Sequence, residues 1–118
     1  MDLYAGLPVT EVDRASAWYE RLLGEPATFV ASPQESVWDL DEGRAVFVEH
    51  APEHAGHARV MLFVDDLEAR VAEVAARGLE PVSREEYDNG VRKANYLDPD
   101  GNQVSLGGLT SVDAGGAE

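Results

Sequence analysis

The sequence predicts an α+β fold: two βαβββ modules in tandem, whose curved mixed sheets surround a concave cavity. Two observations lead to this class. The chain repeats itself at an offset of 55 residues, so that Leu7 corresponds to Leu62 and Pro26 to Pro81, and each copy holds one helical pattern among several strand patterns. A repeat of about half the chain length indicates two copies of one supersecondary unit, because a solenoid needs at least three. One helix covers only one face of each sheet, so the other face stays open.

The first copy contains a strand, a helix and three further strands. Apolar residues alternate at the start and then recur at helical spacing until Gly24, a typical helix stop. A turn at 41–43 separates the last two strands. The expected elements are a strand over 3–9, a helix over about 12–23, and strands over 28–30, 36–40 and 44–49.

The second copy repeats this order. Its helix ends at Gly78, and the turn Asp98-Pro99-Asp100-Gly101 precedes the last strand. The expected elements are strands over 59–64, 81–83, 90–97 and 102–107, with a helix starting at 67. The chain thus divides into a first module over 1–49, a linker over 50–57, a second module over 58–110 and a disordered tail over 111–118, all in one structural domain.

Composition limits the class of protein and partner. The chain has 118 residues, 44% of them hydrophobic, which is enough for one globular domain with a real core. Its net charge of −14 argues against a nucleic-acid partner and fits either a solvated surface or attraction of a cationic ligand. The absence of cysteine excludes disulfides and thiolate chemistry. No apolar run is long enough to span a membrane and no signal segment opens the chain, so we expect a cytoplasmic protein without membrane contact.

Three stretches of the sequence carry a family resemblance. They are 7–15 (LPVTEVDRA) with Trp18-Tyr19 and 22–24 (LLG), 63–67 (FVDDL), and 96–102 (YLDPDGN). Together with the paired modules, they resemble the vicinal oxygen chelate superfamily. This superfamily includes glyoxalases, extradiol dioxygenases, fosfomycin-resistance enzymes and bleomycin-resistance binding proteins. The resemblance covers nearly the whole chain and implies the glyoxalase/bleomycin-resistance fold, but a fold does not by itself give a function.

The resemblance also implies where a metal would lie. Enzymes of the superfamily hold a divalent metal on the concave faces through His, Glu or Gln, at positions that correspond here to Tyr4, Phe47, Arg59 and Ser105. None of these is a usual metal ligand, and the charge of Arg59 opposes cation binding. Glu49 shares a face with Phe47, but one carboxylate without a histidine is a poor site. We therefore expect no metal and no other cofactor, and we assign no catalytic residue.

Strand alternation extends this set to a whole ligand-binding trough. Aromatic and apolar side chains with a few converging polar groups fit a medium-sized, flat organic molecule. Trp38 is included because it aligns with Asn95, although packing in the core or in a dimer contact is the alternative. The expected ligand-binding residues are Tyr4, Trp38, Phe47, Glu49, Arg59, Met61, Phe63, Asn95, Gln103 and Ser105. The aliphatic set expected to pack under the helices is Leu7, Val46, Val48, Val60, Leu62, Val64, Val104 and Leu106.

The linker contains three histidines, His50, His54 and His57. Their spacing is compatible with a small metal site. A solvated connector with incidental histidines is the more common case and is favoured here.

These observations favour a non-catalytic, metal-free protein similar to the bleomycin-resistance branch. Its expected function is to sequester an antibiotic or another bulky aromatic natural product. That branch implies a homodimer with a site at the subunit interface. The alternative is an enzyme: a lyase, isomerase or dioxygenase with displaced metal ligands, or a metal-independent enzyme with Glu49 as base. A structural or regulatory dimer without a small ligand is a third class.

Overall fold

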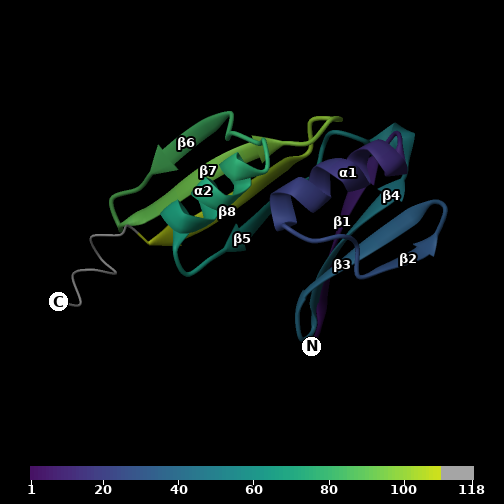
Figure 1. The fold of residues 1–118 in the computed structure, drawn as a ribbon, viewed down its shortest axis with the longest axis horizontal. Coiled ribbons are helices and arrows are strands. Elements are labelled where there is room, and N and C mark those ends of the chain that lie inside the picture. The colour runs from purple at the N-terminus through teal and green to yellow at the C-terminus, as the bar shows by residue number, and fades with distance from the viewer. Residues whose placement is uncertain (110–118) are drawn as a thin grey trace.

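Two four-stranded mixed sheets, each with one helix on one face, form the described part of the chain, residues 1–109, in the computed structural model (Figure 1). The first module contains β1 (Leu3–Val9), α1 (Val12–Leu23), β2 (Phe29–Ser32), β3 (Glu35–Asp41) and β4 (Arg44–His50). After the short 3-10 helix η1 (Pro52–His54), the second contains β5 (Arg59–Phe63), α2 (Leu67–Ala76), β6 (Ser83–Glu86), β7 (Val91–Leu97) and β8 (Gln103–Leu109). The predicted fold class is confirmed. The tail expected over 111–118 lies outside the described residues.

The two sheets have the same strand order. The first is β1-β4-β3-β2 and the second β5-β8-β7-β6, with a parallel pair followed by antiparallel pairs in each. The registers also correspond, since Leu7 lies opposite Val48 and the equivalent Leu62 lies opposite Leu106. The 55-residue repeat therefore reflects a true structural duplication.

The aliphatic face of each sheet packs under its helix, as predicted. Leu7, Val46, Val48, Val104 and Leu106 are buried, while Val60, Leu62 and Val64 pack against the same core. Burying such side chains stabilises the fold by about 1.5–3 kcal/mol each, which fixes the strand register, because a one-residue slip would turn them outward.

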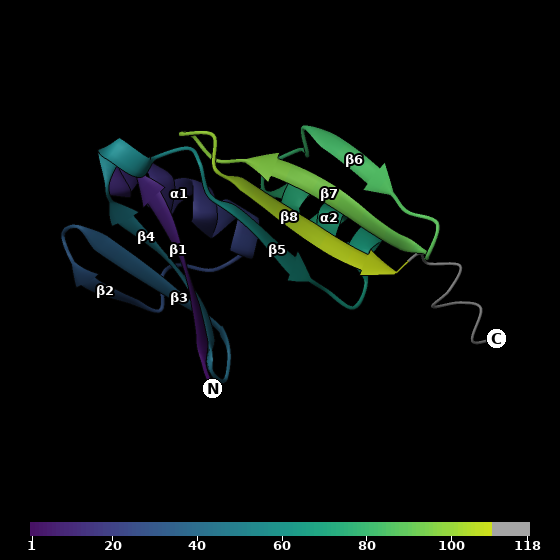
Figure 2. The ribbon, with the colours of Figure 1, turned by 180° about the vertical axis from the view of Figure 1, so that it is seen from behind.

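Both helices lie on the same side of the molecule (Figures 1 and 2). In Figure 1 they lie in front of their sheets, and from behind, in Figure 2, the sheets cover them. The open faces of the two sheets therefore point to one common side. We expected the two concave faces to turn toward each other within one chain, and this is wrong: each remains open in the single chain.

Two sets of contacts hold the modules together: one joins α2 to α1, and the other joins the turn before β8 to β1. Arg77, just after α2, donates from Nε to the carbonyl of Arg21 at 2.6 Å and from Nη2 to that of Leu22 at 3.3 Å. These carbonyls end α1 and lack partners within the helix. On the other side, Asn102 donates from Nδ2 to the carbonyl of Pro8 at 2.7 Å. The turn of the second module thus anchors the end of β1.

One strand lies mostly outside its predicted range. We expected it over 81–83, but β6 runs over Ser83–Glu86 and pairs with β7. The run Ser-Arg-Glu-Glu lacks β-branched and aromatic residues, so its strand propensity is low, and pairing with β7 decides its conformation. No helix within residues 1–109 is long and apolar enough to cross a lipid bilayer.

Candidate functional site

The open face of the first module is aromatic. Tyr4 lies on β1 with 60% of its surface exposed, and Phe47 is half-buried on β4. The ring of Phe47 lies over Gly6, with Cζ 2.8 Å from the place that a Cβ would occupy. The Glu49 carboxylate approaches the same place, at 3.4 Å. A side chain at position 6 would thus displace the ring, and glycine lets it lie flat on the sheet.

Carboxylates accompany these aromatic rings. Glu35 on β3 lies directly opposite Glu49 on β4, and Asp39 lies opposite Ala45, so all three acids share the face of Phe47. Like charges directly opposite each other in an antiparallel pair are destabilising. The first open face is therefore acidic and favours a surface or group of positive charge.

Trp38 does not belong to this face. It pairs with Val46, on the helix side of the sheet, where it is 1% exposed and donates from Nε1 to the carbonyl of Glu25 at 3.0 Å. The expected alignment of Trp38 with Asn95 is off by one residue, because it matches Leu40 with Leu97, whereas the observed registers make Asp39 the equivalent of Leu97. In the observed registers Trp38 corresponds to the buried Tyr96, opposite Val104. The prediction that Trp38 lines the trough is wrong, and it is core.

The open face of the second module carries an apolar shelf beside polar side chains. Met61 and Phe63 on β5 are 50% and 58% exposed. Both lean over Gly107 on β8: Met61 Sδ lies 2.9 Å and Phe63 Cδ1 3.5 Å from the place of a Cβ. We call Met61, Phe63 and Gly107 the apolar shelf. Arg59, Asn95, Gln103 and Ser105 share its face of the sheet, as predicted from alternation.

A chain of hydrogen bonds runs across this face. Gln103 donates from Nε2 to Ser105 Oγ at 3.2 Å, and Ser105 Oγ donates to Asn95 Oδ1 at 2.7 Å. Asn95 Nδ2 then donates to Glu85 Oε2 at 2.7 Å and to Ser83 Oγ at 3.0 Å. Asn95 and Ser105 are nearly fully buried, so these bonds fix their orientation.

Glu85 is the last acceptor in this series of hydrogen bonds, and the sequence analysis did not include it among the site residues. Hydrogen bonds from Tyr87 and Asn95 hold the pKa of its carboxyl below the usual range, and the charges of Lys93 and Arg59 act in the same direction. Lys93 Nζ lies 3.8 Å from Glu85 Oε2 and 5.8 Å from the centre of the Tyr87 ring. Only the pairing of Glu85 with Lys93 across β6 and β7 brings it here, and its flanking residues carried no strand signal.

These faces do not fit a divalent metal ion. The positions implied by the family resemblance hold Tyr4, Phe47, Arg59 and Ser105, and the hydroxyl of Ser105 is already engaged with Asn95 and Gln103. Within residues 1–109, no three His, Cys, Asp or Glu side chains are grouped to hold a metal. The three histidines of the linker are therefore not grouped as metal ligands either. His50 Nδ1 lies 3.1 Å from the carbonyl oxygen of Thr10.

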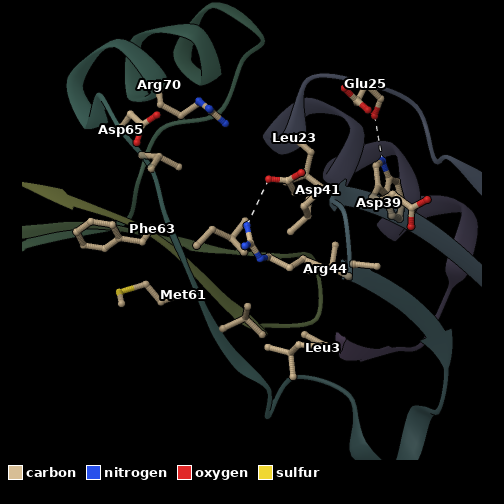
Figure 3. A pocket seen from close by; sticks show the side chains of 18 residues that line it. Leu3, Leu23, Glu25, Asp39, Asp41, Arg44, Met61, Phe63, Asp65 and Arg70 are labelled. Carbon is tan, nitrogen blue, oxygen red and sulfur yellow. Dashed lines mark hydrogen bonds and ion pairs between the residues drawn. The ribbon is translucent and has the colours of Figure 1, made fainter. Parts of the chain in front are cut away.

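A cavity of about 780 Å³ lies between the modules (Figure 3). It borders Leu3, Leu23 and residues 60–64, so it shares Met61 and Phe63 with the apolar shelf. Its charged groups form local pairs, such as Arg44 with Asp41 at 3.3 Å. It has the volume of a small-molecule site, but it lacks a connected polar network. The open faces combine such a network with aromatic surface, and they are the candidate site.

The sequence and the fold match known proteins. Residues 5–107 match the sequence profile of the glyoxalase-like domain. No curated protein matches the sequence. A solved structure of a glyoxalase / bleomycin resistance protein from Catenulispora acidiphila is 44% identical, with a TM-score of 0.88 over 93% of this chain and 99% of that chain.

Two further solved structures share the fold at lower identity. A bleomycin-binding protein complexed with bleomycin is 21% identical, with a TM-score of 0.74 over 93% of this chain and 99% of that one. A lactoylglutathione lyase from Agrobacterium tumefaciens is 19% identical, with a TM-score of 0.72 over 92% of both chains. The same fold thus serves a binding protein and an enzyme, so the local chemistry has to decide between them.

Proposed function

Because this chain belongs to the glyoxalase-like domain family, we propose that it uses the open faces of its two sheets to bind a small organic molecule without a metal ion. Its role is to sequester a bulky aromatic compound, such as an antibiotic or a related natural product, in the cytoplasm. The observation that carries this proposal is the makeup of the open faces: exposed aromatic and apolar side chains beside a fixed polar network, with no donor set suited to a metal.

The chemistry of these faces supports binding over turnover. Aromatic side chains offer stacking worth about 0.5–1.5 kcal/mol per pair beyond the burial of area. The polar side chains are engaged with one another, and the carboxyl of Glu85 has a lowered pKa, which makes it a weak base. The bleomycin-binding protein of similar fold is a precedent for binding of a bulky natural product.

We further propose a homodimer in which the first open face of one chain covers the second open face of its partner. Tyr4, Phe29, Met61 and Phe63 are each at least half exposed on these faces, and contiguous apolar surface usually marks an interface. Apposition of like faces brings the acids of two first faces together, which is repulsive, whereas the one acid of the second face, Glu85, is already paired with Lys93. A two-fold axis then yields two equivalent cavities.

Light scattering tests this assembly. We expect a mass near twice the 12.8 kDa of one chain at micromolar concentration. Tyr4→Glu replaces an exposed aromatic ring of the first open face with a further negative charge. It should therefore lower the measured mass toward that of one chain. A monomer in the unmodified protein would contradict the dimer.

Binding and chemical recovery test the function. Flat aromatic natural products should bind the chelator-treated protein saturably and be recovered unchanged. A compound that returns ring-opened, isomerised or conjugated, at a rate proportional to protein, would replace the proposal with an enzyme. Loss of that turnover in Glu49→Gln would then identify Glu49 as its base.

A further inference from the structure

We propose that the ligand of the second open face is an organic anion, whose carboxylate binds Arg59 while its flat body lies on the apolar shelf. This inference rests on the proposed binding function and adds the chemical class of the ligand. It opposes the expectation from the net charge of −14, which favours a cationic ligand.

Arg59 is unusual because its guanidinium has no partner within residues 1–109. The chain has 23 acidic and 9 basic side chains, so partners are abundant. The basic side chains paired with carboxylates are Arg14, Arg44, Arg70, Arg84, Arg92 and Lys93. Arg77 is bonded to carbonyls, and Arg21 lies in the last turn of α1, where positive charge complements the helix end. Arg59 alone is exposed on an open sheet face without such a role.

The nearest acid on this face is already neutralised. Glu85 accepts hydrogen bonds from Tyr87 and Asn95 and pairs with Lys93 at 3.8 Å. Of the strand positions that point to the second open face, Arg59 and Lys93 are basic and Glu85 is the acid. Lys93 offsets Glu85, so the face keeps one uncompensated positive charge, at Arg59.

A ligand that covers Arg59 removes water from the guanidinium. Leaving a desolvated charge without a counter-ion costs several kcal/mol, so a neutral ligand is disfavoured and a cation is repelled. A carboxylate can accept two parallel hydrogen bonds from the guanidinium, the strongest arrangement available to it. Charges farther away than about 8–10 Å are screened, which is why the local charge outweighs the net charge of the protein.

The strand sets the shape of the ligand. Arg59, Met61 and Phe63 are alternate residues of β5, so successive side chains on the face are about 6.6 Å apart. An anionic group at Arg59 therefore leaves about 7–13 Å of apolar surface along the shelf. That length accommodates a body of two or three fused rings with the carboxylate at one end.

Three naphthalene probes of the same size test the inference: the carboxylate, the neutral carboxamide and the aminomethyl cation. Affinity is measured by titration calorimetry on the unmodified protein, on Arg59→Gln and on Arg84→Gln. Arg84 is the matched control: its substitution removes the same charge from β6 of the same sheet, but Arg84 lies on the other face, where it pairs with Glu68 at 3.1 Å. Light scattering of each variant reports whether the assembly is intact.

We expect the carboxylate to bind about tenfold or more tightly than the carboxamide, in line with one charge-assisted contact. Arg59→Gln should abolish this preference, because carboxylate binding weakens while carboxamide binding, relieved of the cost of desolvating the guanidinium, does not. Arg84→Gln should keep the preference. Equal affinities in the unmodified protein, or tightest binding of the cation, would overturn the inference. So would dissociation of Arg59→Gln into monomers, since Arg59 would then serve the interface. If none of the probes binds at all, the proposed binding function fails as well.

Discussion

The hydroxyl of Tyr19 donates a hydrogen bond to Asp98 Oδ2 at 2.8 Å, and both side chains are buried. Tyr19 lies on α1 of the first module and Asp98 in the turn before β8 of the second. The same carboxylate accepts from the backbone amides of Asp100 and Asn102 and from Asn102 Nδ2. The Asp-Pro-Asp-Gly-Asn turn, which carries the family resemblance, thus joins the modules rather than contributing to the ligand faces.

Tyr19→Phe should lower the free energy of unfolding by about 1–3 kcal/mol, because the buried Asp98 loses a donor. Urea denaturation measures the change. Tyr4→Phe is the matched control: Tyr4 is 60% exposed, and its hydroxyl has no hydrogen bond within residues 1–109. Equal stability of Tyr19→Phe and the unmodified protein would show that the bond does not join the modules energetically.

The same contact predicts a loss of stability in alkali. Burial, the charges of Asp98 and Asp100 and the hydrogen bond to Asp98 raise the pKa of Tyr19 far above its usual value. The unfolded chain releases this proton near its ordinary pKa of about 10, whereas the folded chain retains it. The contribution of Tyr19 is therefore complete below about pH 10 and falls as the pH rises further. Melting temperatures between about pH 8 and 11 should decline less in Tyr19→Phe than in the unmodified protein.

Arg77→Ala should destabilise the protein by about 1–3 kcal/mol, since the last carbonyls of α1 lose the side chain that donates hydrogen bonds to them. Arg70→Ala provides the comparison, because within residues 1–109 the Arg70 side chain forms only an exposed pair with Glu73, at 3.8 Å within α2. Such pairs contribute about 0–1 kcal/mol. Equal effects of the two substitutions in chemical denaturation would argue against the role of Arg77.

Substitutions of Trp38 and Met61 should have opposite effects: one should lower stability without changing affinity, and the other should lower affinity with little change in stability. Trp38→Phe should reduce stability by about 1–3 kcal/mol, because it removes the bond to Glu25 and core volume, and leave affinity for naphthalene carboxylate unchanged. Met61→Ala should weaken binding with little loss of stability, because Met61 is half exposed. Denaturation and calorimetry on both variants check this pairing. If Trp38→Phe lost affinity and Met61→Ala did not, Trp38 would belong to the ligand site after all.

The sequence was sufficient for most of the fold but for only part of the site. The repeat and the alternation of apolar residues predicted both modules and the helix-covered faces, because burial fixes register. Trp38 was misplaced, since Leu40 was matched with Leu97, one position out of the register in which β3 pairs with β4. Glu85 was missed because the polar run around it forms a strand only through pairing with β7. The direction of the open faces depends on contacts between modules, such as that of Tyr19 with Asp98, which local patterns do not encode.

Mapping of amide chemical shifts on the chelator-treated protein, titrated with naphthalene carboxylate, tests the central claim most directly. We predict that the shifts with ligand concentrate on the second open face, at Arg59, Met61, Phe63 and Gly107, with saturation and without added metal. In the same titration of Met61→Ala, these ligand-dependent shifts should disappear. Shifts confined to Leu3, Leu23 and Arg44, which line the cavity between the modules but not the second open face, would contradict the account. Shifts that appear only after a divalent metal is added would contradict it as well.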